Sequence, residues 1–108
     1  MNADNVKSQM RKGILEYCIL LILNRRRAYA NDIIQLLQEA KLIVVEGTLY
    51  PLLTRLKNME LLTYLWIESN QGPPRKYYEL TPKGGEFLSE LEQAWSEVAD
   101  TIKHLKEI

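Results

Sequence analysis

The sequence predicts a mainly α-helical fold with one small antiparallel β-hairpin. Apolar residues recur at helical spacing in three stretches before residue 59 and in a fourth stretch after residue 81. Between them, two short segments rich in Thr, Tyr, Trp, Ile and Leu flank a turn that contains a Gly-Pro-Pro sequence. With 108 residues, 46% of them apolar and 26% charged, the chain has the size and composition of one globular domain.

The first predicted helix runs from about Val6 to Asn24. It is polar in its first half and apolar nearly all round from Ile14 to Leu23, where Glu16 is the one interruption. A helix that is apolar on every side is buried on every side. We therefore expect this helix to lie at the centre of the domain and also to contact a second chain.

A second helix is expected to begin at Asn31 or Asp32, either of which can cap it, and to end near Lys41. The β-branched run Ile43–Val45 that follows is too short for a helix. It is expected to form a turn or a brief strand beside the hairpin.

The third predicted helix begins near Glu46 or Gly47 and ends near Asn58. Its apolar residues share one face and are expected to point inward: Leu49, Leu52, Leu53 and Leu56. The remaining faces are polar and basic: Thr48, Tyr50, Pro51, Thr54, Arg55 and Lys57. This helix therefore presents a polar, cationic surface to its surroundings.

Two strands are expected over Leu62–Ser69 and Lys76–Leu80. The residues between them favour a turn, and their two prolines are expected to stay outside the ladder of backbone hydrogen bonds. Tyr77 and Tyr78 point to opposite faces of their strand, so at least one of them is expected in the core. The result is a hairpin with a basic tip at Arg75.

Thr81 and Pro82 place an N-cap residue before a proline at the first helical position, which predicts the start of a long last helix. Large apolar residues then alternate at intervals of three and four, forming a seam: Leu88, Leu91, Trp95, Val98, Ile102 and Leu105. A helix that continues to the end of the chain is about 38 Å long, more than a domain of this size can cover. We predict that two copies dimerise through this seam; the alternative is packing on the helix's own domain only.

The charges are distributed unevenly although the net charge is zero. Residues 1–85 contain 12 Lys and Arg against 8 Asp and Glu, whereas residues 86–108 contain 2 against 6. This asymmetry favours a basic working surface and an acidic last helix turned away from a polyanion. From the charges alone, a merely solvated acidic helix is an equally good interpretation.

The sequence contains no recognisable catalytic or metal-binding arrangement. The single cysteine, Cys18, lies in an apolar run, and the single histidine, His104, is near the end of the last helix, so neither completes a metal site. Gly-rich phosphate loops and nucleophile elbows are not recognisable either. We therefore expect a protein that is not an enzyme and needs no metal or cofactor.

The longest apolar run, Cys18–Leu23, is much shorter than the ~20 residues that cross a bilayer. No signal peptide with a cleavage site precedes it. We expect a cytoplasmic protein that does not associate with membranes.

A polar, basic third helix followed by a basic hairpin is typical of a winged helix-turn-helix that binds double-stranded DNA. Small residues at a helix start let phosphate approach, and tyrosine hydroxyls and basic side chains bind phosphates or base edges. The residues expected to contact DNA are Gly47, Thr48, Tyr50, Pro51, Thr54, Arg55, Lys57, Asn70, Gln71, Arg75 and Lys76. We assign residues 1–81 to this domain and residues 82–108 to the dimerisation helix.

Two motifs carry a more specific resemblance. Gly47–Leu53 reads GTLYPLL, and Arg75–Thr81 reads RKYYELT, with Gly84 three residues beyond it. In this order and spacing they resemble the PadR family of bacterial and archaeal transcriptional regulators, and the resemblance extends over about Met10–Leu105. It implies a winged-helix domain followed by one dimerisation helix, acting as a homodimeric repressor on a palindromic promoter site.

Carried over by position, the resemblance places the recognition helix at Gly47–Asn58 and the wing tip at Asn70–Lys76. One departure concerns the turn before the second helix. In the family this turn is commonly glycine-rich with a Tyr-Gly pair, whereas Arg25–Ala30 reads RRRAYA. The departure affects the geometry of the loop and not the fold.

Trp95 is the centre of a second candidate site. In short multidrug-responsive members of the family, a tryptophan at a similar place faces its symmetry mate and stacks on flat, often cationic, aromatic ligands. The resemblance thus implies a small aromatic effector at the dimer interface, with Tyr17 and Leu20 as walls. A carboxylate for a cationic ligand would come from Glu92 or Glu16. The alternative is that Trp95 is only the largest side chain of the seam.

Together these features predict a homodimeric DNA-binding regulator, specifically a repressor, on an inverted repeat whose half-sites lie about 10 bp or a multiple of it apart. A ligand between the two last helices would act by changing the angle between them. The rival interpretation is a winged-helix protein-interaction or ligand-binding module that does not bind DNA.

Overall fold

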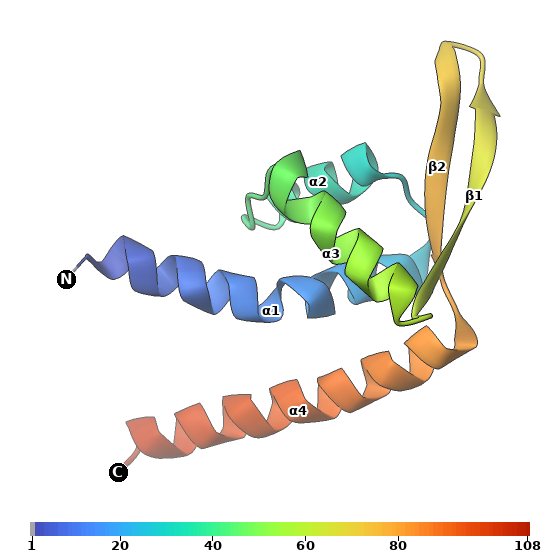
Figure 1. Cartoon of the computed structure of the whole chain (residues 1–108). Coiled ribbons are helices and arrows are strands. Elements are labelled where there is room, and N and C mark those ends of the chain that lie inside the picture. The colour runs from blue at the N-terminus through green and yellow to red at the C-terminus, as the bar shows by residue number, and fades with distance from the viewer. Residues whose placement is uncertain (1) are drawn as a thin grey trace.

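The structure is a computed structural model that describes residues 2–108 (Figure 1). These residues form four helices and one two-stranded antiparallel sheet: α1 (Ala3–Arg25), α2 (Ala30–Glu39), α3 (Glu46–Asn58), β1 (Leu62–Ser69), β2 (Gly72–Leu80) and α4 (Pro82–Lys106). The hairpin stands beside the first three helices and projects past them, while α4 runs back along α1. The predicted mainly helical fold with a small antiparallel hairpin is confirmed.

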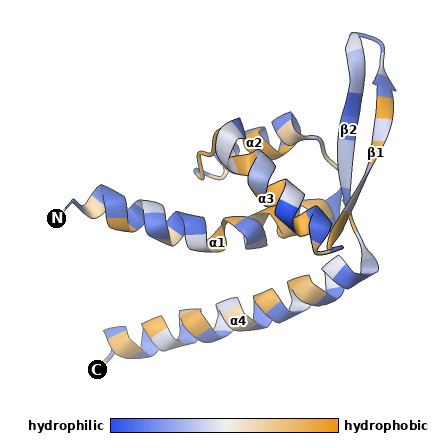
Figure 2. Cartoon of the chain, viewed as in Figure 1, coloured by the Kyte–Doolittle hydropathy of each residue, from blue (hydrophilic) through white to orange (hydrophobic). Residues whose placement is uncertain are grey.

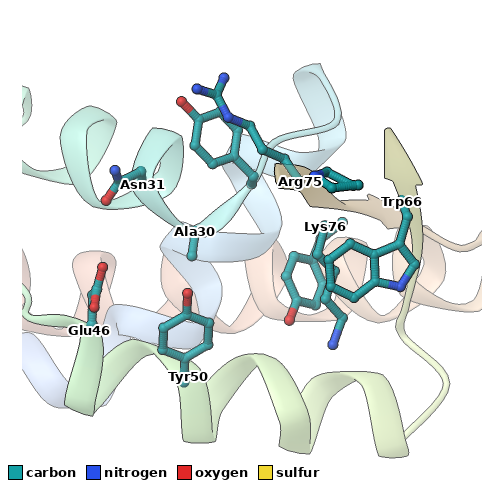
Figure 3. Close-up of a pocket in the computed structure, with 10 residues that line it drawn as sticks. Ala30, Asn31, Glu46, Tyr50, Trp66, Arg75 and Lys76 are labelled. Atoms are coloured by element: carbon teal, nitrogen blue, oxygen red, sulfur yellow. The ribbon is translucent and has the colours of Figure 1, made fainter. Parts of the chain in front are cut away.

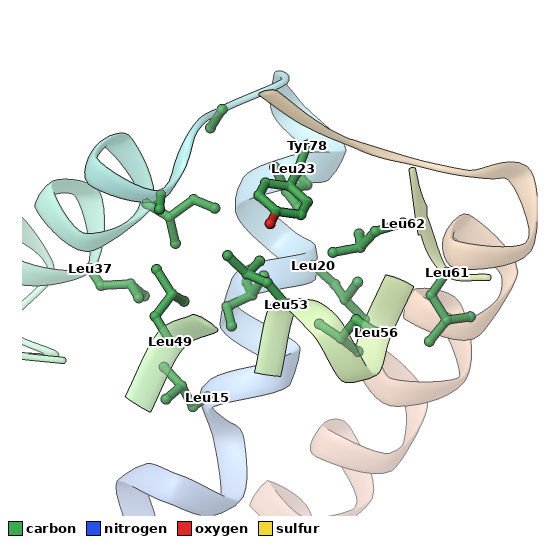
Figure 4. Packing of buried hydrophobic residues seen from close by; sticks show 14 of the residues in the cluster. Leu15, Leu20, Leu23, Leu37, Leu49, Leu53, Leu56, Leu61, Leu62 and Tyr78 are labelled. Atoms are coloured by element: carbon green, nitrogen blue, oxygen red, sulfur yellow. The ribbon is translucent and has the colours of Figure 1, made fainter. Parts of the chain in front are cut away.

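The core is built mainly from leucine and isoleucine side chains of the first three helices (Figure 4). The largest fully buried side chains are Ile19, Leu20, Ile33, Leu49, Leu53, Leu56 and Leu61. Tyr78 of β2 and Leu88 of α4 are also buried in this cluster, so the hairpin and the start of α4 are tied to the helices. This packing places the apolar face of α3 inside and turns its polar face outward.

α1 is only partly covered by the rest of its own chain. Ile19 and Leu20 are buried, whereas Cys18, Leu21 and Ile22 stay partly exposed. The single chain has too few elements to surround this helix, so burial on every side would need the second chain that was expected. None of the helices formed by residues 2–108 has the apolar stretch that a bilayer crossing requires.

The start of α2 differs from the prediction. The helix begins at Ala30 without a side-chain cap, so the expected capping by Asn31 or Asp32 is wrong. Just before it, Ala28 and Tyr78 of β2 exchange two backbone hydrogen bonds of 2.8 and 3.1 Å. This pairing holds the chain extended up to the point where the helix begins.

The connection between α2 and α3 forms no strand. The run Ile43–Val45 is neither helical nor paired, although Val44 is buried in the core. Of the two expected forms, a turn or a brief strand beside the hairpin, the strand is therefore absent. Ala28 pairs with β2 instead.

β2 begins at Gly72 and not at Lys76, and it therefore includes Pro73 and Pro74. The strand therefore starts earlier than predicted, but neither proline has a partner in the register, as expected of residues outside the ladder. A two-stranded sheet leaves one edge of each strand free near the tip, where a residue without an N–H is tolerated. The register is also irregular just before Ser69, which relaxes the pairing there.

α4 begins as predicted, with Thr81 as its N-cap. The Thr81 hydroxyl oxygen accepts a hydrogen bond from the backbone N–H of Gly84 at 2.9 Å. Gly84 is itself buried against the Leu61 carbonyl, where a larger residue has no room. These contacts fix the direction in which α4 leaves the hairpin.

Hydrophobic residues recur along α4 (Figure 2), and this predicted seam is divided between the core and the surface. Leu88 is buried and Leu91 packs against the same core. Assigning Leu88 to a dimer interface is therefore wrong, because its own chain already covers its side chain. The later members of the seam are exposed: Trp95, Val98, Ile102 and Leu105.

Candidate nucleic-acid interface

The outer face of α3 carries the polar residues that were expected to contact DNA. All of them are exposed: Gly47, Thr48, Tyr50, Pro51, Thr54, Arg55 and Lys57. The helix continues through Pro51, and its intervening residues Leu49, Leu53 and Leu56 are buried. Burial of the leucine stripe therefore determines which side chains α3 presents.

Arg55 makes a contact that sequence reasoning did not anticipate. Its guanidinium Nη1 donates to Glu16 Oε1 of α1 at 3.1 Å, although the Arg55 side chain remains 64% exposed. Glu16, considered as a carboxylate for a cationic ligand, instead neutralises part of the cationic face of α3. Arg55 can still approach DNA, but in the free protein it is held against α1.

The first half of α1 flanks the beginning of α3. A hollow at this junction is lined by Thr48 together with Ser8, Arg11 and Lys12. Arg11 and Lys12 were not among the expected DNA contacts, although both are exposed. Arg11 and Lys12 are three and four residues beyond Ser8, so each lies beside it on α1, but only the tertiary structure brings them next to α3.

The cations of the hairpin lie on aromatic rings. Lys76 Nζ is 4.0 Å from the ring centroid of Tyr64 and 5.5 Å from that of Tyr78. The Arg75 guanidinium carbon is 4.7 Å from the ring centroid of Tyr29, which precedes α2. Such contacts favour a cation electrostatically and hold its position. Arg75 and Lys76 are therefore positioned near the helices and not free at the tip.

A cleft of about 360 Å³ separates α3 from the hairpin (Figure 3). Its walls are formed by Tyr29, Ala30, Asn31, Glu46, Tyr50, Trp66, Pro74, Arg75, Lys76 and Tyr78. The expected site residues Tyr50, Arg75 and Lys76 are thus brought together. Tyr29 and Trp66 were missed, although strand alternation places Trp66 on the same face as Tyr64.

The turn of the hairpin is a separate part of the candidate interface. Asn70 and Gln71 are exposed there, and the Gln71 N–H donates to Ser69 Oγ at 3.3 Å. The turn lies at the far end of the projecting hairpin, away from α3 (Figure 1). These two residues can therefore reach a part of a partner that α3 does not touch.

The residues of the second candidate site are only partly brought together. Trp95 is 45% exposed, whereas Leu20 is fully buried in the core. The assignment of Leu20 as a ligand wall is wrong, because no part of it reaches the surface. Partial burial, and then the negative charge of Glu92 on α4, raise the pKa of the Tyr17 hydroxyl. Tyr17 and Glu92 thus lie at the junction of α1 and α4.

Comparison with known proteins identifies the family. Residues 19–90 match the PadR-like family of transcriptional regulators, which is more than half of the chain. The chain belongs to the PadR-like family. It is therefore a DNA-binding transcriptional regulator, and the resemblance seen in its two motifs is confirmed.

Solved structures of PadR-like proteins share this architecture. A PadR-like transcription factor from Bacteroides fragilis is 69% identical, with 94% of this chain and 98% of that chain aligned and a TM-score of 0.78. A PadR-like transcriptional regulator from Bacillus cereus strain ATCC 14579 is 40% identical, with 90% and 95% aligned and a TM-score of 0.80. Among sequence relatives, an uncharacterized protein from Lysinibacillus sphaericus is 31% identical over 100 residues, which are 90% of this chain and 92% of that protein. The winged helix-turn-helix assignment is confirmed.

Members of the PadR-like family are DNA-binding regulators and not enzymes, which confirms the expectation that the chain has no catalytic role. The single histidine, His104, is exposed in the last turn of α4. Residues 2–108 contain no group of three or more His, Cys, Asp or Glu side chains that could hold a metal ion.

Proposed function

We propose that this PadR-like protein is a homodimeric repressor that binds an inverted repeat in a promoter. The observation that carries the proposal is the exposed polar and basic face of α3 beside a hairpin whose cations rest on aromatic rings. Residues 1–81 act as the DNA-binding domain, and residues 82–108 act as the dimerisation helix. The first turns of this helix also belong to the core of the domain through Leu88.

In the proposed complex α3 lies in the major groove. The free N–H groups at its start receive a phosphate, and the hydroxyls of Tyr50 and Thr54 bind phosphates or base edges. Arg55 reads a guanine when it leaves Glu16, since its guanidinium matches the two acceptors of that base. Arg75 and Lys76 neutralise phosphates beside the groove. The complete contact set is Gly47, Thr48, Tyr50, Pro51, Thr54, Arg55, Lys57, Asn70, Gln71, Arg75 and Lys76.

The exposed part of the α4 seam supports dimerisation. Four large apolar side chains follow one side of the helix beyond the core: Trp95, Val98, Ile102 and Leu105. A second copy related by two-fold symmetry would cover them with the same residues, and Leu91 would border this interface. The same symmetry would place two α3 helices on half-sites about 10 bp, or a multiple of it, apart.

A small aromatic ligand at the dimer interface would relieve repression. Trp95 supplies an exposed aromatic face, and Tyr17 and Glu92 lie at the junction of α1 and α4. A flat cationic molecule stacked on Trp95 would change the angle between the two α4 helices and thereby the distance between the two α3 helices. The alternative is that Trp95 only fills the seam.

The DNA-binding proposal is tested by fluorescence anisotropy with a labelled duplex from the protein's own promoter. Wild type is expected to bind. Arg75→Ala should lower the affinity for all duplexes and reduce the slope of log Kd against log salt by about one, because one fewer counterion is released. Arg55→Ala should reduce the preference for one sequence over another. Lys103→Ala, in the last turn of α4, is the matched control and should bind as wild type does. If wild type binds no duplex even at low salt, the rival protein-interaction module is favoured.

The repressor and effector proposals need separate measurements. Deletion of the gene should raise expression from the bound promoter, and a fall in expression would indicate an activator.

A planar aromatic cation such as proflavine should quench tryptophan emission in wild type but not in Trp95→Phe. Equal quenching in both proteins would remove Trp95 from the ligand site.

A further inference from the structure

Trp66 presents a large apolar surface inside the cleft between α3 and the hairpin. It lies in the middle of β1, and 63% of its surface is exposed. Its indole is one wall of the cleft, and Tyr50 of α3 is another (Figure 3). An exposed tryptophan alone needs no explanation, so the argument depends on what surrounds this one.

A positioned cation lies next to the indole. Trp66 is paired in register with Lys76, so their side chains leave the same face of the hairpin. The Lys76 ammonium rests on the rings of Tyr64 and Tyr78, at 4.0 and 5.5 Å from their centroids. These rings hold the ammonium but leave the indole itself uncovered. The cleft therefore offers a fixed positive charge beside a free apolar plane.

The cleft opens onto the outer face of α3. Tyr50 lines both the cleft and the adjoining surface formed by Pro51, Thr54 and Arg55. A duplex seated on that surface therefore also reaches the mouth of the cleft. At the opposite end, on α3, the carboxylate of Glu46 repels phosphate. A phosphate is thus favoured on the hairpin side, next to Lys76.

A DNA strand has the matching chemistry, because its backbone alternates anionic phosphates with the apolar faces of deoxyribose. We propose that Trp66 packs against a deoxyribose of the strand whose neighbouring phosphate is bound by Lys76. The cleft is then a sugar-phosphate subsite that sets the register of α3 in the groove without reading bases. This inference rests on the proposed binding of DNA by α3 and the hairpin.

Salt dependence separates the two side chains of this subsite. Trp66→Ala is expected to weaken specific and non-specific duplexes alike, by roughly ten-fold, with an unchanged slope of log Kd against log salt. Lys76→Ala is expected to reduce that slope by about one, because one fewer counterion is released. Trp66→Phe keeps a flat apolar ring and should retain most of the affinity.

Fluorescence tests the contact in the unmodified full chain. The protein contains 2 tryptophans, so the difference in emission between wild type and Trp66→Phe is the fluorescence of Trp66. A saturating 20-base-pair duplex should protect this signal from acrylamide quenching. The measurement does not depend on the folding of the alanine variant.

The outcomes distinguish this inference from the function on which it rests. If wild type binds no duplex, both are overturned. If wild type binds DNA but Trp66→Ala binds equally well and acrylamide quenching is unchanged, only the Trp66 subsite is overturned. A loss of affinity confined to one DNA sequence would also contradict it, since a sugar contact carries no base preference.

Discussion

At the scale of single residues, Arg55 links the proposed DNA-reading helix to α1. The pair has an N–O distance of 3.1 Å, and the Glu16 side chain is 29% exposed. Glu16 competes with DNA for the guanidinium of Arg55. We predict that Glu16→Gln tightens DNA binding roughly two- to five-fold, with a steeper salt dependence, in anisotropy titrations. The free energy of unfolding should change by less than about 1 kcal/mol, because the pair lies at the surface and its Arg55 partner is well exposed.

The matched control is Glu90→Gln, which makes the same change of net charge at an exposed position of α4. This variant should bind DNA nearly as wild type does. Equal tightening by both variants would mean that net charge, and not release of Arg55, is responsible.

Replacing either of two adjacent glycines at the start of α4 by alanine is expected to change the free energy of unfolding in opposite directions. A Cβ at Gly84 would collide with the Leu61 carbonyl oxygen and lie 2.8 Å from Leu80 Cδ1, whereas a Cβ at Gly85 would meet nothing within 4 Å. Gly84→Ala should lower the free energy of unfolding by about 1–3 kcal/mol. Gly85→Ala should raise it by up to about 1 kcal/mol, because alanine favours the helix. Urea unfolding followed by circular dichroism, at one protein concentration, checks both; a destabilised Gly85→Ala would contradict the assignment.

At the scale of elements, Thr81 joins α4 to the turn that follows α3. Its hydroxyl accepts from the Gly84 N–H at 2.9 Å and lies 2.7 Å from the Glu60 carbonyl oxygen and 3.0 Å from that of Leu61. Thr81→Ala removes both the cap and this link, so we predict a loss of about 1–2 kcal/mol in unfolding free energy. Thr81→Ser keeps the hydroxyl and should lose much less. If the serine and alanine variants are equally unstable, the hydrogen bonds are not the cause.

The elements themselves were largely predictable, but their first residues were less so. The leucine stripe of α3 and the Thr81-Pro82 start of α4 act locally, and the structure has both where they were expected. The start of α2 depends on Ala28 pairing with Tyr78, which is distant in the sequence. Such a contact leaves no periodic signal.

At the scale of the whole molecule, the exposed seam predicts the oligomeric state. Val98 is 49% exposed in the single chain, so Val98→Glu should leave the fold intact. In the proposed dimer, Val98→Glu would bury one carboxylate from each copy. Because burying unpaired charges is unfavourable, sedimentation of this variant should show a monomer. Affinity for the inverted repeat should fall toward that for one half-site, because the two contacts are no longer linked.

Gln93→Glu is the matched control, since it adds the same charge away from the seam, at an exposed position of α4. It should remain a dimer. A dimeric Val98→Glu protein would show that the seam is not the interface.

The molecule measures 57 × 33 × 22 Å, and the hairpin turn and the C-terminal half of α4 lie at opposite ends of it (Figure 1). The acidic residues of this half of α4, Glu97 and Asp100, and its C-cap Glu107 therefore lie far from the hairpin turn. This separation would keep the negative charges of α4 away from a duplex bound to α3.

The helices, the hairpin, the outward face of α3 and the family motifs were predictable from the sequence, because helical periodicity, capping and turn chemistry act over a few neighbouring residues. The structure was needed to show that Leu20 and Leu88 are core residues, that Glu16 holds Arg55, and that Trp66 lines a cleft beside Lys76. Each of these depends on side chains from different elements, whose separation is determined by how the leucine core packs. A periodic pattern identifies a face, but packing decides what that face meets.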